Sequence, residues 1–191
     1  MRKVVFDIET RNVFADVGKN DPALLDIAVI CIYDSETDSY TAYLEEELGK
    51  LWPIIERADM LIGFNTEHFD IPLLNKYYPG DLTKIKSLDI LKEIKKTYGR
   101  RMKLDQLAEG TLGQKKSGHG LDAETWWRQG RIDDIKKYCI DDVRLTKELY
   151  DHAMQHQKLL FKEGKEVLEI KLDTSEWEKS VENKLTFTLP F

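Results

Sequence analysis

One acid in an otherwise apolar helix face constrains this 191-residue chain more than any other feature of its sequence. The long helix that we expect from about 132 to 157 carries one mostly apolar face, and Asp142 lies in the middle of it. A buried carboxylate is costly unless it is neutralised, hydrogen-bonded or bound to a metal. Asp142 therefore indicates either a site with a partner for its charge or a helix that tucks it against a cap or a lysine. The face consists of Ile135, Cys139, Asp142, Thr146 and Leu149.

Two further acids share one face of the first expected strand, residues 3–9. Val5, Asp7 and Glu9 alternate with Val4, Phe6 and Ile8, which is the period of a strand. An apolar strand of this kind is expected inside a sheet, where two acids on one face repel each other unless cations intervene. The alternative is an edge strand whose charges face solvent and discourage aggregation.

The fourth acid follows a short apolar run that ends at Gly63. A polar loop leads to Asp70, which opens a predicted helix and would act as its N-cap if it were considered alone. Considered together, Asp7, Glu9, Asp70 and Asp142 supply the hard oxygen ligands that Mg²⁺ or Mn²⁺ prefers. The sequence therefore indicates a divalent-metal site built from segments far apart in the chain.

The order of predicted elements indicates an α/β fold. Strands at 27–33 and 40–44 form an antiparallel meander through the turn at 34–38, and a short strand at 60–64 returns to the sheet. We expect one domain over residues 1–160 and a C-terminal extension over 161–191, in which the alternating runs 167–172 and 185–189 pair as a β-hairpin. The expected helices span 48–58, 69–78, 90–98, 104–110, 123–128 and 132–157.

Composition limits the class of protein. The chain holds 29 Lys and Arg against 35 Asp and Glu, a net charge of -6, which argues against a protein that coats polyanions indiscriminately. No apolar stretch has the length of a membrane span or the form of a signal peptide, so we expect a soluble, cytoplasmic protein without membrane contact. Cys31 and Cys139 lie in apolar segments without metal-ligand spacing, which indicates neither a disulfide framework nor a zinc site.

Positive charge is concentrated in residues 84–103, which hold eight basic and two acidic side chains, a net charge of +6. This segment is either a solvated helix face or a surface that follows a phosphate backbone.

Three short motifs in this order resemble those of the DEDDy 3'-5' exonucleases. They are Asp7-Ile8-Glu9-Thr10, Asn65 to Asp70, and Tyr138 to Val143. The nearest resemblance is to the proofreading exonuclease domain of family B DNA polymerases and its polymerase-free relatives, and it covers residues 1 to about 155. Residues 104–108 are also similar to the helical segment between the second and third motifs of those domains. The resemblance implies a ribonuclease-H-like mixed β-sheet with flanking helices.

The resemblance also implies two divalent ions, Mg²⁺ or Mn²⁺. Asp7 would bridge both ions, Glu9 and Asp142 would complete the site of the ion that activates the nucleophile, and Asp70 would hold the second ion. Tyr138 would orient the attacking water. Asp141 is an alternative third-motif acid, but the four-residue spacing from Tyr138 selects Asp142.

Three neighbouring residues complete the site that the resemblance implies. Asn65 and Phe69 would contact the terminal nucleotide, and Thr10 would offer its backbone there. The implied activity is hydrolysis of phosphodiester bonds at the 3' end of single-stranded DNA or frayed ends, as in DNA repair. The alternatives are an RNA-trimming exonuclease and a non-catalytic nucleic-acid-binding module with the same fold, and the C-terminal extension could contact a protein partner or a second copy.

Overall fold

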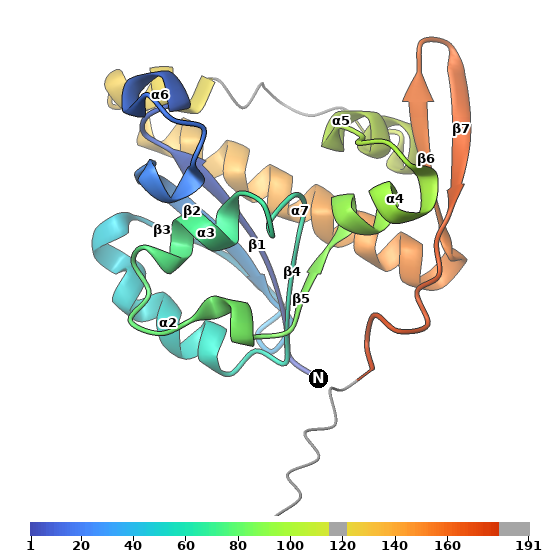
Figure 1. The fold of residues 1–191 in the computed structure, drawn as a ribbon, viewed down its shortest axis with the longest axis horizontal. Coiled ribbons are helices and arrows are strands. Elements are labelled where there is room, and N and C mark those ends of the chain that lie inside the picture. Colours follow the sequence, from blue (N-terminus) through green and yellow to red (C-terminus); the bar gives the residue numbers. More distant parts are fainter. Residues whose placement is uncertain (115–121, 180–191) are drawn as a thin grey trace, which may run out of the picture.

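The first strand, β1 (Lys3–Thr10), lies at the centre of a five-stranded mixed sheet (Figure 1). The structure is a computed structural model that describes residues 1–114 and 122–179. The strand order is β3-β2-β1-β4-β5, in which β2 is antiparallel to both of its neighbours and β1, β4 and β5 are mutually parallel. The other strands are β2 (Ile27–Asp34), β3 (Ser39–Tyr43), β4 (Met60–Gly63) and β5 (Ser87–Asp89).

The central place of β1 follows from its apolar side chains, which are buried on both faces of the sheet. Val4, Phe6 and Ile8 enter one hydrophobic cluster, whereas Val5 enters the cluster on the opposite face, where Asp7 and Glu9 also point. The predicted alternation is confirmed. The edge-strand alternative for the two acids is wrong, because β1 is hydrogen-bonded to β2 on one side and β4 on the other.

Helices cover both faces of the sheet and make three layers (Figure 1). α2 (Leu48–Glu56) and α3 (Asp70–Asn75) pack on the face of Val4, and α4 (Ile90–Tyr98), α5 (Leu104–Leu107) and α7 (Ile132–His156) pack on the other. Over residues 1–114 and 122–179, no helix has both the length and the apolar composition to cross a membrane. The remaining helical segments are α1 (Phe14–Val17), η1 (Pro22–Leu24), η2 (Glu45–Glu47), η3 (Leu82–Lys84), the π-helix η4 (Ala108–Leu112) and α6 (Asp122–Arg128).

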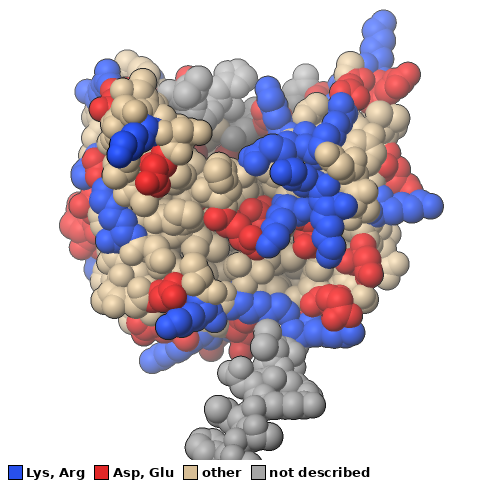
Figure 2. All heavy atoms as spheres, viewed as in Figure 1, with Lys and Arg blue, Asp and Glu red and all other residues tan. Residues whose placement is uncertain are grey.

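The short strand β5 has no counterpart in the sequence-based prediction, because three residues carry too little alternation to be recognised. Its last residue, Asp89, is 5% exposed and caps α4 by accepting hydrogen bonds from the N–H groups of Leu91 and Lys92 at 2.9 and 3.3 Å. Figure 2 shows Lys and Arg side chains gathered over the region of α4, where Lys92, Lys95 and Lys96 are exposed. β5 therefore brings a basic helix beside the sheet.

A C-terminal strand pair is present, but its strands differ from those predicted. β7 (Glu166–Lys171) pairs with β6 (Lys158–Glu163), whereas the run 185–189 lies outside the described residues. β6 was not predicted, because its alternation is short and directly follows the long helix. The pairing of 167–172 with 185–189 stays a prediction. β6 buries Leu159 and Phe161 in the cluster that contains α7. The expected boundary between residues 160 and 161 falls inside β6, and the division into one domain and a C-terminal extension stays a prediction.

Candidate active site

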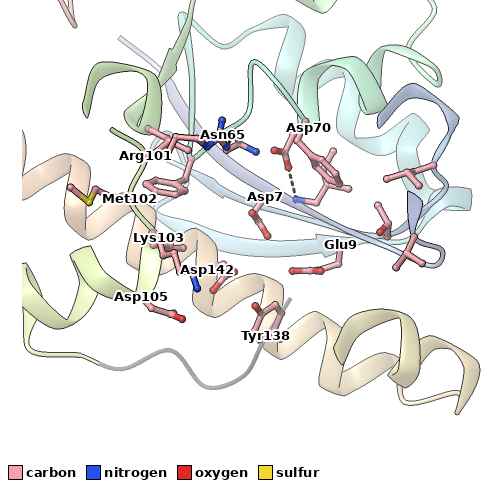
Figure 3. A pocket seen from close by; sticks show the side chains of 18 of the residues that line it. Asp7, Glu9, Asn65, Asp70, Arg101, Met102, Lys103, Asp105, Tyr138 and Asp142 are labelled. Atoms are coloured by element: carbon pink, nitrogen blue, oxygen red, sulfur yellow. Dashed lines mark hydrogen bonds between the residues drawn. The ribbon is translucent and has the colours of Figure 1, made fainter. Parts of the chain in front are cut away.

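Three carboxylates from two distant segments converge at the end of β1. Asp7 and Glu9 extend from the strand and Asp142 extends from α7, and each offers an oxygen within 4.8 Å of the other two (Figure 3). Asp142 is 4% exposed and Glu9 is 9% exposed. Like charges at this separation repel one another strongly where water is largely excluded. Hard oxygen donors in this arrangement fit a divalent cation such as Mg²⁺ or Mn²⁺.

Two buried thiols help to seat α7 against the sheet at this point. The Sγ of Cys139 lies 3.3 Å from the backbone oxygen of Asp7, and the Sγ of Cys31 lies 3.7 Å from the backbone oxygen of Lys136. Both cysteines are free thiols. Burial, and the neighbouring Cys31, raise the pKa of the Cys139 thiol well above its usual value, which keeps it protonated as a donor. The small side chains let the helix approach β1 closely enough for Asp142 to meet the strand acids.

Asp70 lies beside the three converging acids but outside that group. It is the first residue of α3, it is 3% exposed, and its Oδ1 accepts a hydrogen bond of 3.0 Å from the N–H of Ile8 in β1. The N-cap alternative for Asp70 is wrong, because Phe69 occupies the N-cap position. Burial raises the pKa of Asp70 well above its usual value, and the charge of Asp7 raises it further. Asp70 is therefore close enough to Asp7 to share its electrostatic environment.

Tyr138 lies one turn before Asp142 on α7 and lines the same cleft. It is 2% exposed, and its ring packs edge-on against Trp126 with ring centres 5.8 Å apart. Asp141, the alternative third-motif acid, is directed to Arg144 at 3.8 Å and is absent from the lining of the cleft. Tyr138 and Asp142 thus face the cleft, whereas Asp141 lies on a different side of the helix.

The cleft has a volume of about 980 Å³ and holds every site residue expected from the sequence. That volume lies at the upper end of the range for small-molecule sites and is large enough for a nucleotide. The predicted residues that line it are Asp7, Glu9, Thr10, Asn65, Phe69, Asp70, Tyr138 and Asp142.

The wall contributed by residues 101–106 was not assigned to the site from the sequence. Two sequence features overlap this wall, the end of the basic segment 84–103 and the start of the 104–108 motif, but neither indicated a particular side chain. Arg101 approaches from this wall, and its terminal nitrogen donates a hydrogen bond of 2.6 Å to Oδ1 of Asn65. The side chain of Asn65, expected to contact a nucleotide, is therefore already engaged with an arginine.

The loop that carries Asn65 is tightly packed after β4. A Cβ added at Gly63 would collide with Cγ2 of Thr66, so any larger residue here would force the Thr66 side chain to move. Asn65 has a left-handed backbone with φ of 69°, a conformation that asparagine tolerates better than most residues. The ring of Phe69 lies edge-on to that of Phe14, with centres 6.1 Å apart, at the rim of the cleft.

Comparisons with known proteins agree with this architecture. The model of a family described as the RNase_H superfamily matches residues 4–154. Among solved structures, the family B DNA polymerase from the hyperthermophilic archaeon Pyrobaculum calidifontis matches with a TM-score of 0.62 and 17% sequence identity. The match covers 81% of this chain but only 24% of that polymerase chain, and at this identity it shows a shared fold. No curated protein matches the sequence. The predicted ribonuclease-H-like mixed sheet with flanking helices is confirmed.

Proposed function

Because the chain belongs to the RNase_H superfamily, we propose that it is a metal-dependent 3'-5' exonuclease acting on single-stranded DNA. Membership of this superfamily supports a nuclease function in general, and with it binding of nucleic acid. The observation that carries the finer proposal is the convergence of Asp7, Glu9 and Asp142 within 4.8 Å of one another in a cleft that Asp70 and Tyr138 also line. These five residues are the positions at which the sequence resembles the DEDDy motifs.

In this proposal the acids divide the work of binding two divalent ions. Asp7, Glu9 and Asp142 would hold the first ion. Asp70, which accepts a hydrogen bond from the N–H of Ile8 in β1, would hold the second ion together with Asp7. Bound Mg²⁺ or Mn²⁺ would lower the pKa of the attacking water and stabilise the charge on the leaving 3' oxygen. The carboxylates would set where the ions bind, and therefore where the charge on the leaving oxygen is stabilised.

Tyr138 supplies orientation rather than proton abstraction. A tyrosine hydroxyl has an ordinary pKa of about 10, so it is a poor base at neutral pH but a good hydrogen-bonding group. Its ring is held by Trp126, which limits the directions that the hydroxyl can take. We assign Tyr138 the role of positioning the attacking water.

The test is a ladder assay with a matched pair of variants. A 5'-labelled single-stranded oligonucleotide is incubated with the protein and Mg²⁺ or Mn²⁺, and we expect progressive shortening from the 3' end that EDTA abolishes. Asp142→Asn should remove the activity. Asp141→Asn makes the same chemical change one residue away, outside the cleft, and should retain it. A wild-type protein that shortens neither DNA nor RNA under these conditions would contradict the proposal.

The choice of DNA over RNA is part of the same experiment. An RNA oligonucleotide of the same sequence is compared under identical conditions, because recognition of the 2'-hydroxyl is what separates the two substrates. Faster shortening of RNA would replace the proposed substrate by the RNA-trimming alternative. Tight binding of either strand without turnover would favour a non-catalytic module.

A further inference from the structure

The basic segment 84–103 is less positive in three dimensions than in sequence. Four of its eight cations lie within 4.0 Å of a carboxylate. Over the described part of the chain no carboxylate lies within that distance of the other four, Lys86, Lys95, Arg101 and Lys103. Of these, only Arg101 and Lys103 line the cleft. The four ion pairs are Lys84–Asp81, Lys92–Glu67, Lys96–Glu93 and Arg100–Glu163.

Arg101 is held in place without being neutralised. Its contact is the neutral amide oxygen of Asn65, 2.6 Å away, which leaves the positive charge uncompensated and occupies one of five N–H donors. Figure 3 shows Arg101 and Asn65 together on one side of the cleft, with Asp7 in the middle and Glu9 and Tyr138 on the far side. A planar guanidinium with spare donors is suited to bidentate contact with a phosphate.

Asn65 is itself anchored by the core. Its backbone N–H donates to Oδ1 of Asp89 at 2.8 Å, and the N–H of Glu67 donates to Oδ2 of the same side chain at 3.1 Å. Asp89 is buried and also caps α4, so one carboxylate ties the loop after β4 to the helix that leads to Arg101. The guanidinium is therefore positioned before any ligand arrives, which lowers the entropy cost of binding.

The preceding arginine has a different environment. Arg100 donates to both carboxylate oxygens of Glu163 at 2.9 Å, and its guanidinium lies 5.4 Å from the ring centre of Phe161. Arg100 is therefore engaged with the hairpin and is absent from the cleft lining. The two adjacent arginines can therefore be compared, because within the described residues Arg100 is paired with a carboxylate and Arg101 is not.

We propose that Arg101 binds a backbone phosphate of the polynucleotide next to the scissile linkage, and that Asn65 is its positioning residue. The acidic cluster repels a phosphodiester strand, and a cation on the opposite wall offsets that repulsion where the strand must pass. The identity of the ligand as a single-stranded polynucleotide rests on the proposed function. The assignment of the contact itself rests on the Arg101–Asn65–Asp89 arrangement.

The first test measures binding apart from turnover. Fluorescence anisotropy of a 5'-labelled oligothymidylate is recorded with Ca²⁺ in place of Mg²⁺ at several KCl concentrations. Arg101→Gln should weaken binding about tenfold, as expected for a lost charged hydrogen bond. It should also reduce the slope of log K against log salt by about 0.7, the value for one phosphate contact on a single strand. Arg100→Gln removes the same charge and should leave both quantities nearly unchanged. Equal effects of the two variants would overturn the proposal.

The second test locates the phosphate. Single neutral methylphosphonate linkages are placed at successive positions from the 3' end. For the wild type we expect one position near the 3' end at which affinity falls, and Arg101→Gln should show no further loss at that position. Additive losses at every position would refute a direct contact.

The third test addresses Asn65. Asn65→Gly accepts the left-handed backbone but lacks the side-chain oxygen, and it should raise the KM for the oligonucleotide with little effect on kcat. Asn65→Asp keeps an acceptor but places a carboxylate against Arg101, so it neutralises the guanidinium and should raise KM as well. A wild-type KM in either variant would remove Asn65 from the proposal. A wild type that binds the oligonucleotide but does not cut it would reject the proposed exonuclease function and leave the Arg101 contact intact. If Arg101→Gln cuts normally and binds with wild-type affinity, the Arg101 contact is rejected and the exonuclease function is retained.

Discussion

The two ends of the β1–β2 pair both bury carboxylates, but one end brings an acid against a base and the other brings acids against one another. At the start of β1, Asp34 is 4% exposed and accepts hydrogen bonds from the Nε and a terminal nitrogen of Arg2 at 3.0 and 2.6 Å. At the other end, Asp7 and Glu9 meet the further acid Asp142. One end is an acid–base pair and the other is a concentration of like charge.

The pKa directions follow this difference. Burial by itself would raise the pKa of Asp34, but the hydrogen bonds from Arg2 and the N–H of Glu36 bring it below its usual value. For Asp70, burial raises the pKa and the charge of Asp7 adds to the rise. The comparison shows that burial of acids does not by itself mark a site. Acids that gather with one another in a cleft are the stronger indication, because a divalent cation would relieve their mutual repulsion.

The largest expected effect comes from the acidic end. Asp7→Asn should reduce turnover by about 10³-fold or more, because several kcal/mol of metal-dependent stabilisation of the transition state would be lost. Turnover and thermal unfolding are measured on the same preparations.

Metal linkage sharpens this result. Mg²⁺ or Mn²⁺ should raise the melting temperature of the wild type, because a ligand that binds only the folded state stabilises it by mass action. Asp7→Asn should show a much smaller rise. An equal rise in both proteins would place the bound ion elsewhere.

A mutation at the acid–base end should change the stability of the protein and leave its activity unchanged. Arg2→Gln leaves the buried carboxylate of Asp34 without its cation and should lower the free energy of unfolding by about 3 kcal/mol. Turnover by the folded fraction should be unchanged, because Arg2 and Asp34 are absent from the cleft lining. Urea unfolding and a turnover assay provide the two measurements, and a drop in turnover per folded molecule would contradict the separation of the two ends.

The pH dependence of the same pair gives a smaller effect of known sign. The folded-state pKa of Asp34 is lower than its unfolded value, so its contribution to stability is complete above the unfolded pKa of about 3.9. It is lost as the pH falls through the folded pKa. The difference in unfolding free energy between the wild type and Asp34→Asn should therefore be constant from pH 7 to about pH 5 and shrink at lower pH. A difference that grew on acidification would be inconsistent with this pair.

The smallest effect is expected from an ion pair at the surface. Lys92 and Glu67 are 2.5 Å apart, but their side chains are 60% and 36% exposed. Lys92→Gln should change the free energy of unfolding by less than about 0.5 kcal/mol, because solvent screens exposed pairs. If Lys92→Gln lowered the free energy of unfolding as much as Arg2→Gln, burial would not explain the difference between the Lys92–Glu67 and Arg2–Asp34 pairs.

The local sequence pattern predicted the structure correctly where residues that are close in sequence are also close in space. The alternation in residues 3–9 predicted both faces of β1, and the apolar face around Asp142 predicted the orientation of α7. The motifs also located the acids, because each motif lies within one strand end or one helix turn. β5 and the partner of β7 were missed, since three residues carry little periodicity and strand pairing joins segments that the pattern of either one does not specify.

Residue type and spacing alone thus determined which side chains were candidates for the chemistry, because a carboxylate in an apolar setting is stable only with a cation, a proton or a hydrogen-bond donor beside it. Only the folded chain decided which groups lie beside each acid and each base. The packing of α7 on β1 brought Asp142 to Asp7, and the capping of α4 by Asp89 brought Arg101 to Asn65. The fold also paired Lys92 with Glu67 and Arg100 with Glu163, partners that lie far away along the chain. Electrostatic partners are set by distance in space, and that distance comes from the burial of apolar faces far from the site.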